Sequence, residues 1–323
     1  MIQAEQKQAS GSIAFVIPVL NGDRFIERCL NQISKQMREG DELIIADNGS
    51  TDATLDIARR ADVRTLVKRG VTIGALRNLG AEATGCSRLA FIDADCLMCD
   101  GWRSAVDRVL SDDSVSAVGS FYDLPEQATW VERAWWSFRP RHEHRTSFLI
   151  SGNLVIRREI FESVGGFDES LVTDEDTDLS RRLIAEQAVL VEAPAARVIH
   201  LGNAKSLAAF YKKERWHATG IIGTMGAANL DRPMLMTFVF IAGILGALTC
   251  IVLPVAPSLR GFSILMLCPA PVATAGFKVM KHKNFRYFPQ LVLLYSLVYI
   301  ARVAALISGL ASKLAGYRSR QRL

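Results

Sequence analysis

Residues 13–17 read IAFVI, a nearly continuous apolar run rich in β-branched side chains. This composition is typical of a strand buried on both faces of a parallel sheet. Over residues 25–33 the apolar side chains recur at helical spacing, and a second apolar run, LIIA, follows at residues 43–46. Strand, helix and strand at this spacing predict a right-handed βαβ unit.

The same alternation continues along the chain. We predict a helix over residues 52–60, a strand over residues 63–67, a helix over residues 73–84 and a strand over residues 89–92. Further along the chain we predict a strand over residues 148–156. In open α/β sheets the ligand lies beyond the carboxyl ends of the strands. The sequence therefore predicts an α/β protein whose site is formed by the residues that follow its strands.

Polar side chains do follow these strands. Asn21 follows the first strand, Asp47 and Asp52 follow the second, and Asp93 and Asp95 follow the fourth. We expect them to converge on one edge of the sheet. No GxGxxG or P-loop pattern is present, so the common dinucleotide and NTPase layouts are not expected.

The motif Asp93-Ala94-Asp95 places two carboxylates one residue apart at the end of a strand. Oxygen ligands of this kind favour Mg²⁺ or Mn²⁺, which often hold substrate phosphates as well. The pair therefore points to nucleotide-sugar chemistry. By itself the motif is weak evidence, because Asp-x-Asp is also common in turns.

Several motifs in one order resemble those of the family-2 glycosyltransferases of GT-A fold. They are VIPVLN at residues 16–21, DNGSTD at 47–52, RNLG at 77–80, DAD at 93–95, GGFD at 165–168 and EDTDL at 175–179. The resemblance covers roughly residues 12–220. It implies a GT-A (Rossmann-like, mostly parallel sheet) catalytic domain, which we assign to residues 12–232.

The resemblance implies a set of donor-binding residues: Pro18, Asn21, Asp47, Asp52, Arg77 and Asp93. Asp47 would face a uracil-type base, Asp52 the nucleotide near the ribose, and Arg77 the diphosphate. Asp93 would bind the ribose or the sugar, and Asp95 the metal. Structural alternatives stay open, because Asp47 lies in a good turn sequence, Asp52 could cap a helix and Arg77 could be a solvated helix charge.

Four acids lie at positions 174, 175, 176 and 178, at the start of a predicted helix. The pattern Thr173-x-x-Asp176 is close to a capping box, but four acids exceed what a cap requires. Their mutual repulsion should raise the pKa of at least one of them, as a general base needs. The resemblance makes Asp176 this base, in a displacement that inverts the sugar, and Glu175 is its possible substitute.

Other residues are placed around the acceptor and the metal by the same resemblance. Gly166 and Asp168 would lie on the acceptor side, and His200 near the metal, although a lone histidine is more often structural. Residues 212–216 (KKERW) resemble the Gln-x-x-Arg-Trp motif of processive members, which puts Arg215 and Trp216 on the acceptor side. Lys212 replaces the glutamine, which argues against processivity, and a basic helix on a membrane surface is the alternative.

Charge and hydropathy divide the chain near residue 233. Residues 233–323 carry ten Lys/Arg and no Asp or Glu, whereas the first 232 residues hold all 33 carboxylates and 28 Lys/Arg. A nucleic-acid-binding protein would carry its basic residues on a recognition domain, so we expect no nucleic-acid partner. Apolar segments at residues 234–256, 262–277 and 288–311 predict two or three membrane-anchoring helices.

Residues 1–11 are polar and lack the apolar region of a signal peptide, so we expect a disordered N-terminus and a catalytic domain on the cytoplasmic side of the inner membrane. The basic tail favours an even number of crossings. Arg302, inside the third apolar segment, conflicts with a simple span. The six scattered cysteines indicate a reduced compartment, and Cys96-x-x-Cys99 lacks the partners of a zinc site.

The leading hypothesis is a membrane-anchored, metal-dependent, inverting glycosyltransferase. It would move a sugar from a nucleotide-sugar donor to a hydroxyl of a lipid-linked or membrane-proximal acceptor, with membrane lipids as further partners. Two alternatives stay open: a nucleotidyltransferase acting on sugar phosphates, and a catalytically inactive membrane scaffold of the same fold.

Overall fold

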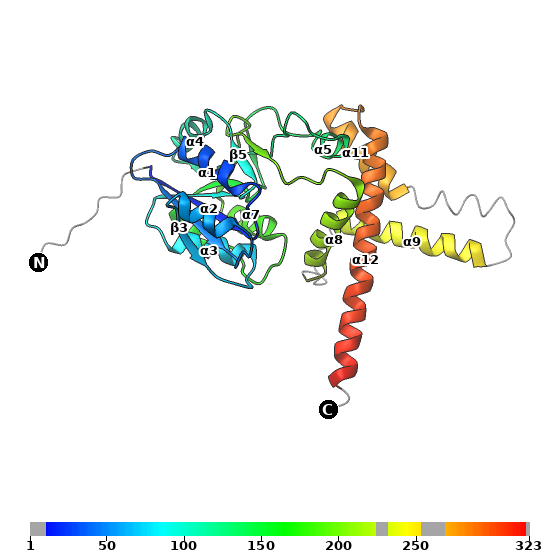
Figure 1. Ribbon diagram of the computed structural model, residues 1–323. Coiled ribbons are helices and arrows are strands. Elements are labelled where there is room, and N and C mark those ends of the chain that lie inside the picture. The colour runs from blue at the N-terminus through cyan, green and yellow to red at the C-terminus, as the bar shows by residue number, and fades with distance from the viewer. Residues whose placement is uncertain (1–10, 224–231, 253–268, 321–323) are drawn as a thin grey trace, which may run out of the picture. The chain divides into compact units, whose positions relative to one another are not determined.

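The computed structural model describes residues 11–223, 232–252 and 269–320 (Figure 1). Its contacts divide the chain into two compact units. The first unit is formed by Met1–Glu126 and Arg139–Asn203, and the second by Gln127–Phe138 and Ala204–Leu323. The disordered N-terminus that the sequence predicts falls outside the described residues except for Gly11.

This division differs from the predicted boundary after residue 232. Two segments that the sequence assigns to the catalytic domain, residues 127–138 and 204–232, belong to the second unit. We call the first the catalytic unit and the second the helical unit.

The catalytic unit alternates strands and helices. In chain order its elements are β1 (Ile13–Val19), α1 (Ile26–Ser34), β2 (Glu42–Asp47), α2 (Thr54–Arg60), β3 (Arg64–Val67), α3 (Ile73–Glu82), β4 (Arg88–Ile92), β5 (Cys96–Met98), α4 (Trp102–Leu110), β6 (Val115–Gly119), β7 (His144–Thr146), β8 (Asn153–Arg157), α6 (Arg158–Ser163), α7 (Glu175–Ala185), β9 (Val189–Glu192) and β10 (Val198–His200). The predicted βαβ beginning is thus confirmed.

Eight strands form the main sheet in the order β3-β2-β1-β4-β8-β6-β9-β7. The first four in this order run parallel, while β8 lies antiparallel to both β4 and β6. Strand β9 is parallel to β6, and β7 is antiparallel to β9. The sheet is therefore mixed, and six of its eight strands run in one direction, as expected for a mostly parallel sheet. A separate antiparallel ribbon joins β5 to β10.

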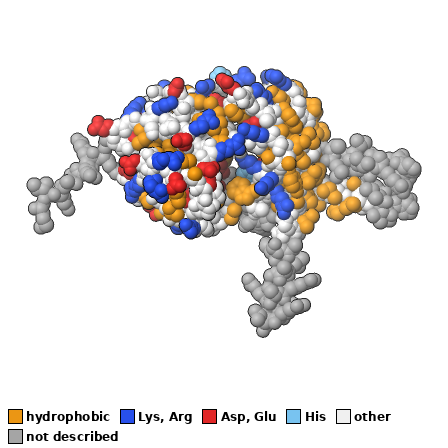
Figure 2. Space-filling view, in the orientation of Figure 1, with side chains coloured by type: hydrophobic (Ala, Val, Ile, Leu, Met, Phe, Trp, Pro, Cys, Tyr) orange, Lys and Arg blue, Asp and Glu red, His pale blue; other side chains and the backbone are white. Residues whose placement is uncertain are grey.

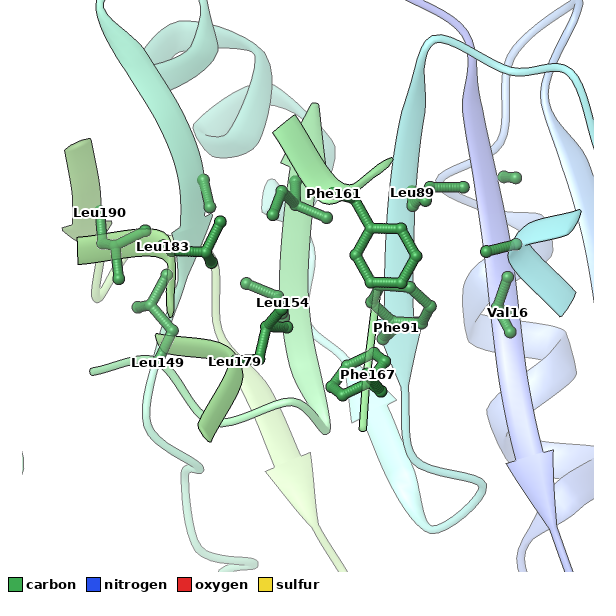
Figure 3. Packing of buried hydrophobic residues seen from close by; sticks show 14 of the residues in the cluster. Val16, Leu89, Phe91, Leu149, Leu154, Phe161, Phe167, Leu179, Leu183 and Leu190 are labelled. Atoms are coloured by element: carbon green, nitrogen blue, oxygen red, sulfur yellow. The ribbon is translucent and has the colours of Figure 1, made fainter. Parts of the chain in front are cut away.

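Alternate residues of β1 face opposite layers of the sheet. Val16 joins a buried cluster that includes Phe91, Phe161 and Phe167 (Figure 3). Phe15, one position earlier, contacts Trp102 of α4 at a ring-centroid distance of 5.8 Å. Each such side chain contributes roughly 1.5–3 kcal/mol by its burial. This two-sided burial explains why β1 is a continuous apolar run.

Two strand boundaries differ from the predicted ones. β1 continues through Pro18 to Val19, and the proline is tolerated because pairing with β4 ends at Val16. The strand predicted from residue 148 begins only at Asn153. Before it, the Gly152 carbonyl accepts a hydrogen bond from the Asp93 N–H at 3.1 Å, so this segment turns toward the end of β4.

The helical unit contains α5 (Trp130–Trp135), α8 (Leu207–Gly223), α9 (Arg232–Val252), α11 (Pro269–His282) and α12 (Phe288–Arg320). Trp135 packs edge-on against Phe210 at 4.8 Å and contacts Tyr295 at 5.4 Å between ring centroids. These contacts explain why α5 belongs with the helices that follow it by more than 70 residues.

One described helix is long and apolar enough to cross a membrane, over Phe288–Gly309. The predicted segment at residues 234–256 appears as a shorter apolar helix, Leu235–Thr249, and its end lies outside the described residues. Of the segment at 262–277, residues 262–268 also lie outside them, and the rest belongs to α11. Figure 2 shows hydrophobic side chains concentrated over the helical unit and charged side chains interspersed over the catalytic unit.

Candidate active site

The loops after β1 and β2 are joined by hydrogen bonds. Asn21, at a φ of 52°, donates its N–H to Ser50 Oγ at 2.8 Å and accepts the Thr51 N–H on Oδ1 at 2.9 Å. A Cβ on Gly22 would lie 3.8 Å from the Cβ of Ala94, within the Asp-x-Asp motif. The predicted convergence of these loops at one edge of the sheet is confirmed.

Asp47 is fully buried at the end of β2. Its Oδ1 accepts the N–H groups of Gly49 and Ser50 at 2.7 and 2.8 Å, so the turn role is real. Its Oδ2 is buried without a hydrogen-bond partner in the described part of the chain. Because a buried carboxylate oxygen without a donor is costly, this atom is suited to accept a hydrogen bond from a ligand.

Asp52 also has a structural role. Its Oδ1 accepts the N–H of Thr54 at 3.0 Å, and its Oδ2 accepts the N–H of Asp23 at 3.1 Å. Although burial acts in the other direction, these hydrogen bonds lower the pKa of Asp52. The carboxylate therefore ties α2 to the loop after β1, and its contact with a nucleotide stays a prediction.

Arg77 is not a solvated helix charge, because only 1% of it is exposed. Its Nη2 donates to Asp93 Oδ1 at 2.8 Å and its Nη1 to Glu175 Oε1 at 2.7 Å. Although burial lowers it, the two carboxylates raise the pKa of Arg77 above its usual value. This guanidinium thus bridges the Asp-x-Asp motif and the acidic segment of α7. A diphosphate contact by Arg77 stays a prediction.

Asp95 and His200 are brought together by the β5–β10 ribbon. His200 pairs with Cys96 in register, and its Nε2 lies 3.3 Å from Asp95 Oδ1. The Leu201 N–H donates to the Asp95 carbonyl at 2.9 Å. A Cβ on Gly202 would lie 1.9 Å from Asp95 Oδ2, so only glycine leaves room for this carboxylate.

Ligand atoms of Asp95, Cys96 and His200 all lie within 4.8 Å of one another, a spacing that fits a metal ion. Cys96 is fully buried, and burial raises the pKa of its thiol well above the usual value. Hard cations such as Mg²⁺ and Mn²⁺ prefer oxygen and nitrogen donors to a thiol. The oxygen and nitrogen donors that remain, from Asp95 and His200, suit a divalent cation such as Mn²⁺ or Mg²⁺.

The two candidate bases at the start of α7 differ in their surroundings. Glu175, 9% exposed, binds Arg77 and accepts the Ser151 hydroxyl at 3.1 Å. Asp176 is more exposed, and its Oδ1 accepts the N–H of its neighbour Thr177 at 2.8 Å. Burial, and then the charge of Glu175, raise the pKa of Asp176 to about 7.

The helix begins at Glu175 with Asp174 as its N-cap, and no side-chain cap hydrogen bond forms there. The capping-box alternative for Thr173 and Asp176 is therefore wrong. Asp178 is held by Arg181 and Arg182 at 2.6 and 2.7 Å. Of the acids on this helix, Asp176 is best placed to exchange a proton.

The predicted acceptor-side residues fall in different places. Gly166, at a φ of +68°, leaves room for Asn78, whose Oδ1 would lie 2.8 Å from an added Cβ. Asp168 is exposed and accepts the Ser170 N–H and hydroxyl, which lower the pKa of Asp168. Arg215 and Trp216 lie exposed on α8 of the helical unit.

Sequence reasoning missed Tyr122, Ser151 and Gly152. Tyr122 donates its hydroxyl to Asp93 Oδ2 at 3.1 Å, and its ring stacks on His200 at 4.4 Å between centroids. Ser151 binds Glu175. No motif flags these residues, and the only local signal is a glycine in an apolar stretch, which often marks close approach of a backbone.

A mixed sheet whose parallel strands end in an Asp-x-Asp motif, with a histidine supplied by a small antiparallel ribbon, defines the GT-A class of glycosyltransferases. The model described as "Glycosyl transferase family 2" matches residues 14–165, and that of "Glycosyl transferase family group 2" matches residues 133–311, more than half of the chain. The chain belongs to the family-2 glycosyltransferases.

Two curated relatives illustrate this. The glycosyltransferase AglE of Haloferax volcanii is 28% identical over 183 residues, which cover 53% of this chain and 60% of the relative. A PGL/p-HBAD biosynthesis glycosyltransferase of Mycobacterium tuberculosis is 25% identical over 238 residues, covering 72% of this chain and 69% of that protein. The chain thus spans about three fifths to two thirds of these relatives.

Solved structures share the fold. The mannosyltransferase PcManGT from Pyrobaculum calidifontis superposes with a TM-score of 0.60 at 16% identity, covering 91% of this chain and 86% of that one. GalNAc-T7 superposes with a TM-score of 0.50 at 16% identity, covering 66% of this chain and 52% of that one. At such identities the likeness concerns the fold alone.

Proposed function

We propose that this protein is a membrane-associated, inverting glycosyltransferase that uses a nucleotide-sugar donor, a divalent metal and Asp176 as general base. The observation that carries the proposal is the link made by Arg77, which joins Asp93 of the Asp-x-Asp motif to Glu175, the neighbour of Asp176. Donor-side and acceptor-side carboxylates are thereby held in one connected cluster.

The chemistry assigned to Asp176 follows from its surroundings. A base with a pKa of about 7 is partly ionised at neutral pH and can accept a proton. It takes the proton of an acceptor hydroxyl as that oxygen bonds to the anomeric carbon. The bond from this carbon to the diphosphate breaks, and its electron pair leaves with the nucleoside diphosphate. One displacement of this kind inverts the sugar's configuration.

Glu175 is less suited to this role. Its carboxylate is bound by Arg77 and Ser151, and these charge-assisted contacts leave it closed to an acceptor. We therefore assign Glu175 the role of raising the pKa of Asp176 rather than that of a substitute base.

Asp95 and His200 would hold the metal, with Mg²⁺ and Mn²⁺ both compatible with their donor atoms. When bound, a divalent cation neutralises charge on the departing diphosphate. Two structural neighbours support this assignment, because PcManGT is described in complex with GDP-Man and Mn²⁺, and GalNAc-T7 with UDP, GalNAc and Mn²⁺. Asp47, through its unpartnered Oδ2, would bind the nucleotide base.

Membrane association is proposed from the helical unit. In the apolar helix Phe288–Gly309, only 33% of the 18-residue stretch that could cross a membrane is buried. Large apolar side chains such as Leu245 and Ile307 are more than half exposed. Arg302 is accommodated within the unit, because its Nη1 lies 3.3 Å from Thr237 Oγ1 and its guanidinium lies over Tyr299. We place the catalytic unit on the cytoplasmic side and expect a lipid-linked or membrane-proximal acceptor.

The first experiment is thermal stability of the detergent-purified protein against nucleoside diphosphates and nucleotide sugars, with Mn²⁺ or with a chelator. Ligand at about 100 times its Kd should stabilise by roughly 2.7 kcal/mol. We expect this shift with one nucleotide only, in the presence of metal, and its loss in Asp95→Ala.

Asp113→Ala serves as the matched control, because its side chain is fully exposed and its carboxylate makes only a 3.4 Å contact with Arg157. It should keep the shift of the wild type. A shift that survives in Asp95→Ala, or that needs no metal, would remove the metal assignment. No shift with any nucleotide would favour the inactive scaffold.

A further inference from the structure

Tyr122 contacts two groups to which the proposed mechanism assigns different tasks. Its hydroxyl donates to Asp93 Oδ2 at 3.1 Å, and Asp93 is the carboxylate assigned to the ribose or the sugar. Its ring stacks on the imidazole of His200, with 4.4 Å between centroids and an angle of 24° between planes. A tyrosine that only filled the core would need neither contact.

The position of Asp93 is fixed from two sides. Arg77 holds Oδ1 at 2.8 Å while Tyr122 holds Oδ2, so the carboxylate cannot rotate without losing a hydrogen bond. Behind the pair lies Gly152, where an added Cβ would be 2.1 Å from both Asp93 Oδ2 and the Tyr122 hydroxyl. The backbone is thus shaped around this hydrogen bond.

The backbone around Tyr122 is tied to the strand that carries His200. The Asp123 N–H donates to the Val198 carbonyl at 2.7 Å, and the His200 N–H donates to the Asp123 carbonyl at 3.1 Å. Arg139 Nη1 donates to the Tyr122 carbonyl at 2.9 Å. These backbone hydrogen bonds therefore fix the position of Tyr122 relative to His200.

We propose that Tyr122 is a positioning residue that acts through two separable groups. Its hydroxyl orients Asp93 for the donor sugar or ribose, and its ring orients the His200 imidazole for the metal. This inference rests on the proposed function, since it presumes that Asp93 and His200 have those roles.

Tyr122→Phe separates the two groups, because it removes the hydroxyl and keeps the ring. We would measure Mn²⁺ binding by electron paramagnetic resonance of the free ion, and KM for the donor together with kcat, on the full-length protein in detergent. Mn²⁺ affinity should stay within about twofold of the wild type, while KM for the donor rises about tenfold, as expected for loss of a hydrogen bond to a charged group.

Tyr122→Met removes the ring as well, with a flexible apolar side chain filling the space. Mn²⁺ affinity should now fall by about tenfold, as loss of an outer contact to a metal ligand typically does. Tyr211→Phe, on α8 of the helical unit, is the matched control and should leave Mn²⁺ affinity unchanged.

The outcomes separate this inference from the proposed function. A wild type that binds neither Mn²⁺ nor any nucleotide would overturn both. A wild type that binds them, with Tyr122→Phe unchanged in donor KM or weakened equally toward Mn²⁺ and donor, would overturn only the role of Tyr122. Mn²⁺ affinity that stays unchanged in a folded Tyr122→Met would overturn the role of the ring, while Tyr122→Phe decides the role of the hydroxyl.

Discussion

The two units bury charged side chains in opposite ways. In the catalytic unit, Arg77 is 1% exposed and bridges the carboxylates of Asp93 and Glu175. These two residues lie close in sequence to Asp95 and Asp176, which are both partly exposed. In the helical unit, the Lys278 ammonium lies over the rings of Trp135, Phe138 and Tyr295, at 5.1, 5.4 and 5.7 Å. The first cluster holds a cation between carboxylates, and the second places a cation over aromatic rings.

This difference separates charged residues placed for a reaction from charged residues placed for packing. Buried charges are costly, and a fold keeps them either for a reaction or for a specific packing. Burial raises the pKa of Glu214 to about 7 and lowers the pKa of Lys278 to about 8, so both are perturbed as strongly as the catalytic candidates. Perturbed pKa values alone would not tell the two clusters apart, and exposure does not either, because Glu214 and Lys278 are half-buried like Asp95 and Asp176. The neighbouring groups do, because Arg77 is bound by carboxylates whereas Lys278 lies over aromatic rings.

The sharpest test of this comparison is Asp176→Asn. Loss of the general base should lower kcat by about 10²–10⁴-fold, because proton transfer from the acceptor hydroxyl then lacks its acceptor. Binding of the nucleotide and metal should not change. Initial rates with a nucleotide-sugar donor, combined with the thermal shift measured with the nucleoside diphosphate, check both expectations.

Asp178→Asn is the matched control, because it makes the same substitution on the same helix at a residue held by Arg181 and Arg182. It should change kcat by no more than a few-fold. If kcat of Asp176→Asn also changes by no more than a few-fold, Asp176 is not the base. The charged cluster around Arg77 would then have only a structural role, like the cluster around Lys278.

A second prediction concerns Lys278 and the aromatic rings around it. Lys278→Met removes the cation from its three aromatic neighbours and leaves Glu214 with less positive charge nearby. We expect a loss of stability of about 2 kcal/mol, seen as a lower Tm of the helical unit, with nucleotide binding unchanged. Adding Glu214→Gln should restore most of the loss, because no buried charge is then left without compensation.

Lys281→Met, an exposed lysine on the same helix, is the control and should leave Tm within about a degree. Should Lys278→Met abolish nucleotide binding while the helical unit stays folded, the cluster would have a role in the reaction, and the contrast between the two units would fail.

The elements up to β4 could be predicted because their signals are local. The apolar run of residues 13–17, for example, is fixed by burial on both sheet faces, and the loops after parallel strands must meet at one edge. The Asp-x-Asp motif and the acids of α7 are likewise visible as short patterns. Their roles could be proposed before any contact was known.

The contacts that organise the site could not be predicted in this way. Arg77 and Glu175 are 98 positions apart in the chain, and Tyr122 and Asp93 are 29 apart. No pattern of residue spacing predicts either contact. A solvated helix charge was therefore an open alternative for Arg77, and its burial between two carboxylates excludes it. Similarly, α5 was assigned to the catalytic domain because its packing on Phe210 and Tyr295 is not encoded near it in the chain.

The smallest expected effect tests how closely the catalytic charges are coupled. Because the base must be ionised, kcat/KM should fall below about pH 7, the pKa of Asp176, by tenfold for each further pH unit. Glu175→Gln removes the repulsion that, after burial, raises this pKa, and it leaves more of the Arg77 charge to stabilise the Asp176 carboxylate. The acidic limb of the profile of kcat/KM against pH should therefore move to lower pH. Near pH 6 the variant then keeps a larger fraction of its plateau kcat/KM than the wild type does. Glu175→Asp, which keeps the charge, should leave the limb close to its original position. A limb that does not move in Glu175→Gln would mean that burial alone sets the pKa of Asp176, and that the Arg77 bridge fixes geometry without tuning the base.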